Sequence, residues 1–136
     1  GLATLPVRVR AQQASAQTVA VALAGHGLVR RVFYPGLPEC DPQGLIGTQM
    51  SGPGSLLAFE VGSAEHAERI PSAVGMITHA VSLGGIDTLI QHPAGLTHRP
   101  VAADAKPHAS LLRVSVGLED PSDIVADLVQ AIEATR

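Results

Sequence analysis

An arginine in a short β-rich segment has the residue type and position best suited to bind a ligand. Arg113 lies in Leu112-Arg113-Val114-Ser115-Val116, where apolar and polar residues alternate. Because strand side chains alternate between the two faces, Arg113 and Ser115 are predicted to lie opposite the three apolar residues. A guanidinium held on a strand can bind a carboxylate through two parallel hydrogen bonds. The pattern alone still favours a solvated or ion-paired surface arginine, because most arginines are exposed.

The segment Ser82-Leu83-Gly84-Gly85 is the second candidate. Two glycines that interrupt strand-like sequence indicate a bulge or a close approach of the backbone to a ligand. A simple turn gives the same pattern and is the more common cause. Both interpretations remain open on the residues alone.

The other reactive residues do not suggest a site of their own. The six histidines follow no zinc-ligand spacing, and the single cysteine, Cys40, cannot complete one. The only lysine, Lys106, lies in a segment rich in Pro and Ala, whereas a Schiff-base lysine needs a shaped pocket. Asp120 is better explained as a helix cap than as an acid–base partner of Glu119. We therefore expect no metal site, and no catalysis by this chain alone.

The elements that must position these residues follow from periodicity and turn signals. Helices are predicted over residues 2–23, 41–50 and 63–76, and a last helix is predicted to start after Asp120. Strands are predicted over residues 28–34, 55–61, 81–83, 86–91 and 111–116. Ser63 and Asp120 are candidate N-caps, and Pro71 is expected to break or restart its helix. This order predicts an α/β (α+β) two-layer sandwich with helices on one face of a small sheet.

The overall composition excludes several classes of protein. With 136 residues, 46% of them hydrophobic and 15% charged, the chain suits one domain with one core. A formal charge of −3 without a basic stripe argues against nucleic acid as a partner. No apolar run approaches the length of a membrane span, and the first residues do not read as a signal peptide. We therefore expect a cytoplasmic protein.

Several segments match, in order and spacing, the segments of one enzyme family. They are Gly1-Leu2-Ala3-Thr4-Leu5-Pro6-Val7-Arg8, Val32-Phe33-Tyr34-Pro35-Gly36-Leu37-Pro38, Gln49-Met50-Ser51-Gly52, Ser82-Leu83-Gly84-Gly85, Leu89-Ile90-Gln91-His92-Pro93-Ala94 with Thr97-His98, and Leu112-Arg113-Val114-Ser115-Val116-Gly117-Leu118-Glu119-Asp120. Over nearly the whole chain they resemble the C-terminal half of the pyridoxal-phosphate enzymes of Cys/Met metabolism (trans-sulfuration). This family includes methionine γ-lyase, cystathionine γ-lyase and cystathionine γ-synthase.

The resemblance implies the C-terminal domain of a fold-type I enzyme. Its sheet is expected to be small and mainly antiparallel, and residues 1–25 resemble the helix that connects it to a large domain absent from this chain. By the same resemblance, Arg113 binds the substrate α-carboxylate, Ser82 helps to position that carboxylate, partly through its backbone, and Leu83 lines the pocket. Pyridoxal phosphate and its Schiff-base lysine are expected in the absent domain, so this chain carries no catalytic or cofactor-binding residue. An oriented carboxylate would set the reacting bonds correctly against the cofactor.

Val81 departs from the pattern of the cystathionine enzymes, which often carry Glu before this Ser-Leu-Gly-Gly segment. An apolar residue favours γ-elimination from an uncharged thioether such as methionine or homocysteine, and the alternative is a trans-sulfuration enzyme acting on cystathionine or an O-acyl homoserine. The family also implies a homotetramer. Residues 102–109 depart from the usual family sequence. A competing hypothesis is a free-standing module that binds an amino acid or a partner without catalysis.

Overall fold

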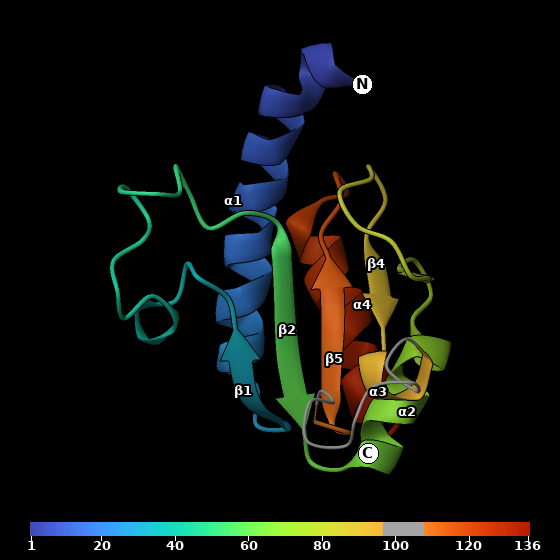
Figure 1. Ribbon diagram of the computed structural model, residues 1–136. Helices are drawn as coiled ribbons and strands as arrows, with labels where there is room; N and C mark the ends of the chain where they lie inside the picture. The colour runs from blue at the N-terminus through green and yellow to red at the C-terminus, as the bar shows by residue number, and fades with distance from the viewer. Residues whose placement is uncertain (97–107) are drawn as a thin grey trace.

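A five-stranded sheet forms one layer of the molecule, in a computed structural model that describes residues 1–96 and 108–136 (Figure 1). In chain order the strands are β1 (Val29–Phe33), β2 (Leu56–Val61), β3 (Thr78–His79), β4 (Leu89–Gln91) and β5 (Leu111–Ser115). Across the sheet they run β1-β2-β5-β4-β3. Every pair is antiparallel except β3 and β4, which are parallel. The expected mainly antiparallel sheet is thus confirmed.

Helices form the second layer. The helical elements are η1 (Leu2–Thr4), α1 (Leu5–Ala24), η2 (Pro38–Cys40), α2 (Ala64–Ala73), α3 (Pro93–Leu96) and α4 (Pro121–Ala134). In Figure 1 α1 and α4 lie behind the sheet, and the N-terminal turns of α1 extend beyond its edge. None of the helices in the described ranges is long and apolar enough to cross a bilayer.

Side-chain alternation places the core between the two layers. On β2, Leu57 and Phe59 face the helices, and on β5 Leu112 and Val114 do the same. The helices contribute the apolar residues Ala16, Val19, Ala20, Leu23, Ala67, Ile70, Ile124, Leu128, Ala131 and Ile132. All of these side chains are buried, so the removal of apolar surface from water holds the helices to this one face.

Both predicted N-caps are confirmed. The Ser63 hydroxyl accepts a hydrogen bond from the His66 N–H at 3.1 Å, and the Asp120 carboxylate accepts one from the Ser122 N–H at 2.8 Å. The expected break at Pro71 is wrong, because the residue lies inside α2, which continues to Ala73. Pro71 is buried in the last turns of the helix, where its ring removes few hydrogen bonds and contributes apolar contacts.

Two predicted elements are absent from the places where we expected them. Residues 41–50 form turns and not a helix, because the Asp41 carboxylate accepts hydrogen bonds from the N–H groups of Leu45 and Ile46 at 2.8 and 3.1 Å. Residues 81–83 are a loop and not a strand, and β3 lies just before them. The Ser82 carbonyl is bound by an arginine side chain and not by a neighbouring strand.

Candidate functional site

The site is built around Arg113, on the face of β5 that points away from the helices. We call this the open face, because the helices cover the other one. This strand lies between β2 and β4, and Arg113 stands opposite Ala58 on one side and Gln91 on the other. The neighbouring Leu112 and Val114 are completely buried against the helices, whereas Arg113 is half-buried on the other face. The orientation that the alternation predicted is therefore confirmed.

Two hydrogen bonds fix the guanidinium of Arg113 in place. Its Nη2 donates to the carbonyl of Ser82 at 2.9 Å and to Oε1 of Gln91 at 2.7 Å. Gln91 is itself only 2% exposed, so it offers a rigid acceptor. Among residues 1–96 and 108–136, Nη1 and Nε of Arg113 have no hydrogen-bond partner, and no carboxylate forms an ion pair with it. A guanidinium has five N–H donors, so several remain for a ligand.

The loop that Arg113 contacts comprises residues 81–87, and we call it the glycine loop. All its residues are exposed, including the apolar side chains of Val81, Leu83 and Ile86. Gly84 has a φ of +74°, in the left-handed region that L side chains rarely adopt. The two glycines therefore form a sharp turn beside Arg113, which agrees with the turn interpretation of this segment.

Three side chains hold the backbone of the glycine loop. Besides the bond from Arg113 to the Ser82 carbonyl, the Gly84 N–H donates to Oγ of Ser115 at 3.1 Å. The Gly85 carbonyl accepts a hydrogen bond from Nε2 of Gln12 at 2.6 Å. Arg113 and Ser115 come from the open face of β5, and Gln12 comes from α1. The loop is thus held by polar contacts, although it buries little apolar surface.

The end of the glycine loop is fixed by Glu119, just before α4. The Glu119 carboxylate accepts hydrogen bonds from the N–H and the hydroxyl of Thr88, at 2.7 and 2.6 Å. The Thr88 hydroxyl in turn accepts one from the Gly117 N–H at 2.9 Å. A Cβ on Gly117 would lie 2.3 Å from the carbonyl oxygen of Ile86, so only glycine fits there. The segment after β5 therefore supports the loop that Arg113 binds.

Gln12 and Gln91 belong to this site, although we did not predict either of them from the sequence. Strand alternation could have revealed Gln91, since it puts this residue opposite the buried Ile90, on the face that carries Arg113. Gln12 carries no such signal, because 73 positions of sequence separate it from Gly85. Glu119, for which the sequence supports no acid–base role, makes a positioning contact instead.

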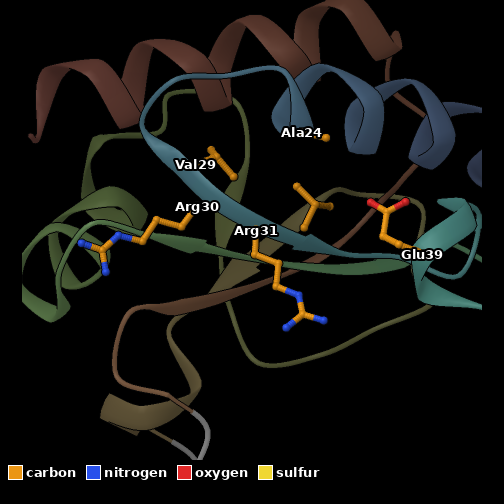
Figure 2. A pocket seen from close by; sticks show the side chains of 6 residues that line it. Ala24, Val29, Arg30, Arg31 and Glu39 are labelled. Atoms are coloured by element: carbon orange, nitrogen blue, oxygen red, sulfur yellow. The ribbon is translucent and has the colours of Figure 1, made fainter.

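A different arginine on the same sheet has a different environment. A hollow of about 170 Å³ on edge strand β1 is lined by Ala24, Val29, Arg30, Arg31, Val32 and Glu39. Figure 2 shows the exposed Arg31 side chain directed away from α1, and its guanidinium carbon lies 4.6 Å from the centroid of the Phe33 ring. Arg31 is thus engaged with a ring at the sheet edge, while Arg113 lies on a central strand beside a loop.

Two histidines of the described residues make ordinary structural contacts. His66 is 6% exposed, and its Nε2 lies 2.8 Å from the carbonyl oxygen of Ile132, which links α2 to α4. His26 lies 3.3 Å from the Glu133 carboxylate at the surface. Within residues 1–96 and 108–136 no three His, Cys, Asp or Glu side chains gather in a way that could hold a metal ion. His98 lies outside these residues.

The cofactor that the resemblance implies does not fit the described residues. The single lysine, Lys106, lies outside them, so they offer no amine for a Schiff base. Of the three aromatic rings, Tyr34 and Phe59 are completely buried in the core and Phe33 lies under Arg31. What the site does offer is a guanidinium that forms no ion pair with a carboxylate of the described residues and that keeps free N–H donors beside the glycine loop, which suits an anionic group of a ligand.

Comparison with known proteins gives a consistent result. The family model described as "Cys/Met metabolism PLP-dependent enzyme" matches residues 1–133. An L-methionine γ-lyase of Brevibacterium sandarakinum is 53% identical over 137 residues, which cover 100% of this chain and 35% of that protein. The cystathionine γ-synthase of Escherichia coli (strain K12) is 36% identical, over 100% of this chain and 36% of its own length.

Solved structures share the fold. A methionine γ-lyase from Micromonospora echinospora superposes with a TM-score of 0.87 at 40% identity, over 96% of this chain and 35% of that one. The chain thus spans about a third of the length of the relatives that it matches. Because the family model covers nearly all of its residues, the chain belongs to the Cys/Met-metabolism family of pyridoxal-phosphate-dependent enzymes.

Proposed function

We propose that this chain binds the α-carboxylate of the amino-acid substrate in a pyridoxal-phosphate-dependent carbon–sulfur lyase, with Arg113 as the carboxylate ligand. The observation that carries the proposal is the guanidinium on the open face of β5, held by Ser82 and Gln91 through one nitrogen only. The remaining donors can form the paired hydrogen bonds that a carboxylate prefers. An oriented carboxylate fixes the rest of the substrate for reaction.

The glycine loop supplies the other wall of this proposed subsite. Ser82 presents its carbonyl to Arg113, and Val81 and Leu83 are each 56% exposed beside it. A solved relative, the cystathionine γ-lyase of Lactobacillus plantarum, is described as a complex with L-serine, and it is 29% identical to this chain. An α-amino acid therefore occurs as a ligand among proteins of this fold, which supports a carboxylate as the partner of Arg113.

Methionine is the substrate that we favour. Methionine γ-lyases are 53% and 52% identical to this chain, against 36% for the Escherichia coli cystathionine γ-synthase. The exposed Val81 is apolar and suits an uncharged thioether. Cystathionine is the second candidate, because a Micromonospora echinospora protein among the structural relatives is described both as a methionine γ-lyase and as a cystathionine γ-lyase.

The proposal requires a second part that carries the cofactor. We propose that residues 1–25, most of which form α1, connect this chain to a domain that supplies the Schiff-base lysine, and that the intact enzyme is a homo-oligomer. In that arrangement this chain binds and orients the substrate, and the chemistry takes place on the other domain. The intact enzyme is the form in which the proposal is tested.

Replacing Arg113 tests the proposal. In the intact enzyme, Arg113→Ala should lower kcat/KM for the release of methanethiol from L-methionine by roughly 100-fold or more, because a charged hydrogen-bonded pair is lost. The absorbance of the bound cofactor should stay unchanged. Arg31→Ala is the matched control, since it removes a guanidinium from the same sheet away from the glycine loop. Equal kinetics of Arg113→Ala and the parent enzyme would refute the proposal.

A further inference from the structure

We infer that Gln12 on α1 is a positioning residue for substrate-carboxylate binding, because it holds the glycine loop in the place where Arg113 meets it. The inference rests on the proposed role of Arg113 and adds a residue from a different layer of the molecule. Gln12 is 1% exposed, and its Nε2 donates to the Gly85 carbonyl at 2.6 Å.

The Gln12 contact is important because few other interactions hold the glycine loop in place. Its side chains are all exposed, so apolar burial contributes little to its position. Its backbone is held at Ser82 by Arg113, at Gly84 by Ser115, at Gly85 by Gln12, and at Ile86 by the Leu118 N–H, which donates to the Ile86 carbonyl at 2.8 Å. The contacts at Ser82 and Gly84 come from β5, and the one at Ile86 comes from the segment after β5. Among these contacts of the described residues, only that of Gln12 comes from the helical layer.

Loss of the Gln12 contact would act on Arg113 through the loop. The Ser82 carbonyl is one of the two acceptors that orient the guanidinium, and it lies three residues before Gly85. If the loop moves away, Arg113 loses an acceptor, and its free donors no longer point in a fixed direction. Carboxylate binding then weakens, while the cofactor, which is bound elsewhere, is unaffected.

Another glutamine of α1 provides a matched control. Gln17 Nε2 donates to the carbonyl of Gly36 at 3.3 Å, so it also links the helix to a glycine carbonyl, but in the turn after β1. Gln12→Met and Gln17→Met each remove one such bond and keep a side chain of similar volume that suits a helix. Gln12→Glu is a second variant at the first position, because an ionised carboxylate cannot donate a hydrogen bond.

The experiment measures steady-state kinetics of the intact enzyme with L-methionine, and inhibition by L-methioninamide, which lacks the carboxylate. Gln12→Met and Gln12→Glu should each raise KM for L-methionine about fivefold to tenfold, as expected for the loss of one buried hydrogen bond. The inhibition constant of L-methioninamide and the cofactor absorbance should each change by less than about twofold, because these do not depend on carboxylate binding. The value of kcat should change less than KM, because saturating L-methionine restores the bound complex. Gln17→Met should leave KM within about twofold of the parent value.

Arg113→Ala, measured in parallel, separates the two ideas. If it raises KM and both Gln12 variants do not, the inference about Gln12 is overturned and the role of Arg113 stands. An equal rise of KM in Gln17→Met, or an equal weakening of L-methioninamide, would also overturn it, because the effect would then be a general one of α1. If Arg113→Ala leaves KM unchanged, the proposed function fails first and the inference falls with it.

Discussion

Side chains bind backbone groups in both the loop before β3 and the loop after it, but the number of side chains differs. Before β3, a single carboxylate, that of Asp127 on α4, accepts the N–H groups of Gly75, Met76 and Ile77 at 2.8, 2.9 and 2.8 Å. After β3, the glycine loop is held by three side chains from two elements, one backbone group each.

The difference separates a structural loop from the loop that we propose to line a ligand site. The contact of Asp127 satisfies three consecutive donors, and Ile77 is buried at 4% exposure. Burial raises the pKa of Asp127, but the hydrogen bonds from Gly75, Ile77 and Met76 outweigh it and keep that pKa below its usual value. The glycine loop instead leaves apolar side chains and arginine donors at the surface. Changes in the first loop should therefore affect stability, and changes in the second should affect KM.

Asp127→Ala should give the largest effect on stability. It leaves three N–H groups without their acceptor. We expect the free energy of local opening, which protects these amides from hydrogen exchange, to fall by about 2–3 kcal/mol. The loss is not larger because water can reach the partly exposed N–H groups. Hydrogen exchange of the amides of Gly75, Met76 and Ile77 in the intact enzyme measures this loss. Asp123→Ala, at an exposed position of the same helix, should cost less than about 1 kcal/mol. If Asp127→Ala changed KM but left the hydrogen exchange of these amides unchanged, the loop before β3 would not be the structural one of the two.

Gly84→Ala and Gly75→Ala should differ, although each adds one methyl group. Gly84 has a φ of +74°, so Ala should strain the glycine loop by about 1–2 kcal/mol and raise KM. A Cβ on Gly75 would meet the Asp127 carboxylate at 3.6 Å, an ordinary contact, and its φ is not in the left-handed region. Steady-state kinetics with L-methionine should separate the two variants. Equal values of KM would show that the loop tolerates displacement.

Acid should weaken the Asp127 contact. Because the pKa of Asp127 is lower in the folded state, its contribution is complete above the unfolded value of about 3.9 and is lost as the pH falls through the folded value. The parent protein should therefore lose more stability below about pH 4 than Asp127→Asn, which does not ionise. Urea unfolding at a series of pH values measures both. If the free energy of unfolding fell with pH in the same way for both proteins, the ionised Asp127 would not contribute to stability as proposed.

Val81→Glu should give the smallest effect, a change of substrate preference. The side chain is 56% exposed, so a glutamate fits without loss of fold. Its carboxylate could pair with the distal ammonium of cystathionine, and a partly exposed pair should shift the ratio of kcat/KM toward cystathionine by about twofold to fivefold. Competition between L-methionine and cystathionine measures the ratio. An unchanged ratio would mean that Val81 does not contribute to specificity.

The parts of the fold and of the site that the sequence predicted are those with local causes. The alternation around Arg113 and the caps at Ser63 and Asp120 depend on neighbouring residues, and the structure confirms all three. Residues 81–83 have strand-like composition but form a loop, because side chains of β5 and not another strand bind their backbone. The contact of Gln12 depends on how α1 lies over the sheet, which no local pattern reveals.

α1 also joins parts of the molecule that are far apart in the sequence. Gln13 accepts a hydrogen bond from the Gly54 N–H at 3.2 Å, so three glutamines of this one helix, with Gln12 and Gln17, each attach a separate glycine-containing segment. A helix with its backbone hydrogen bonds intact is a stiff rod. A small tilt of this rod would displace the three segments together, so a movement of the helix would reach the proposed substrate site and the two other segments at the same time.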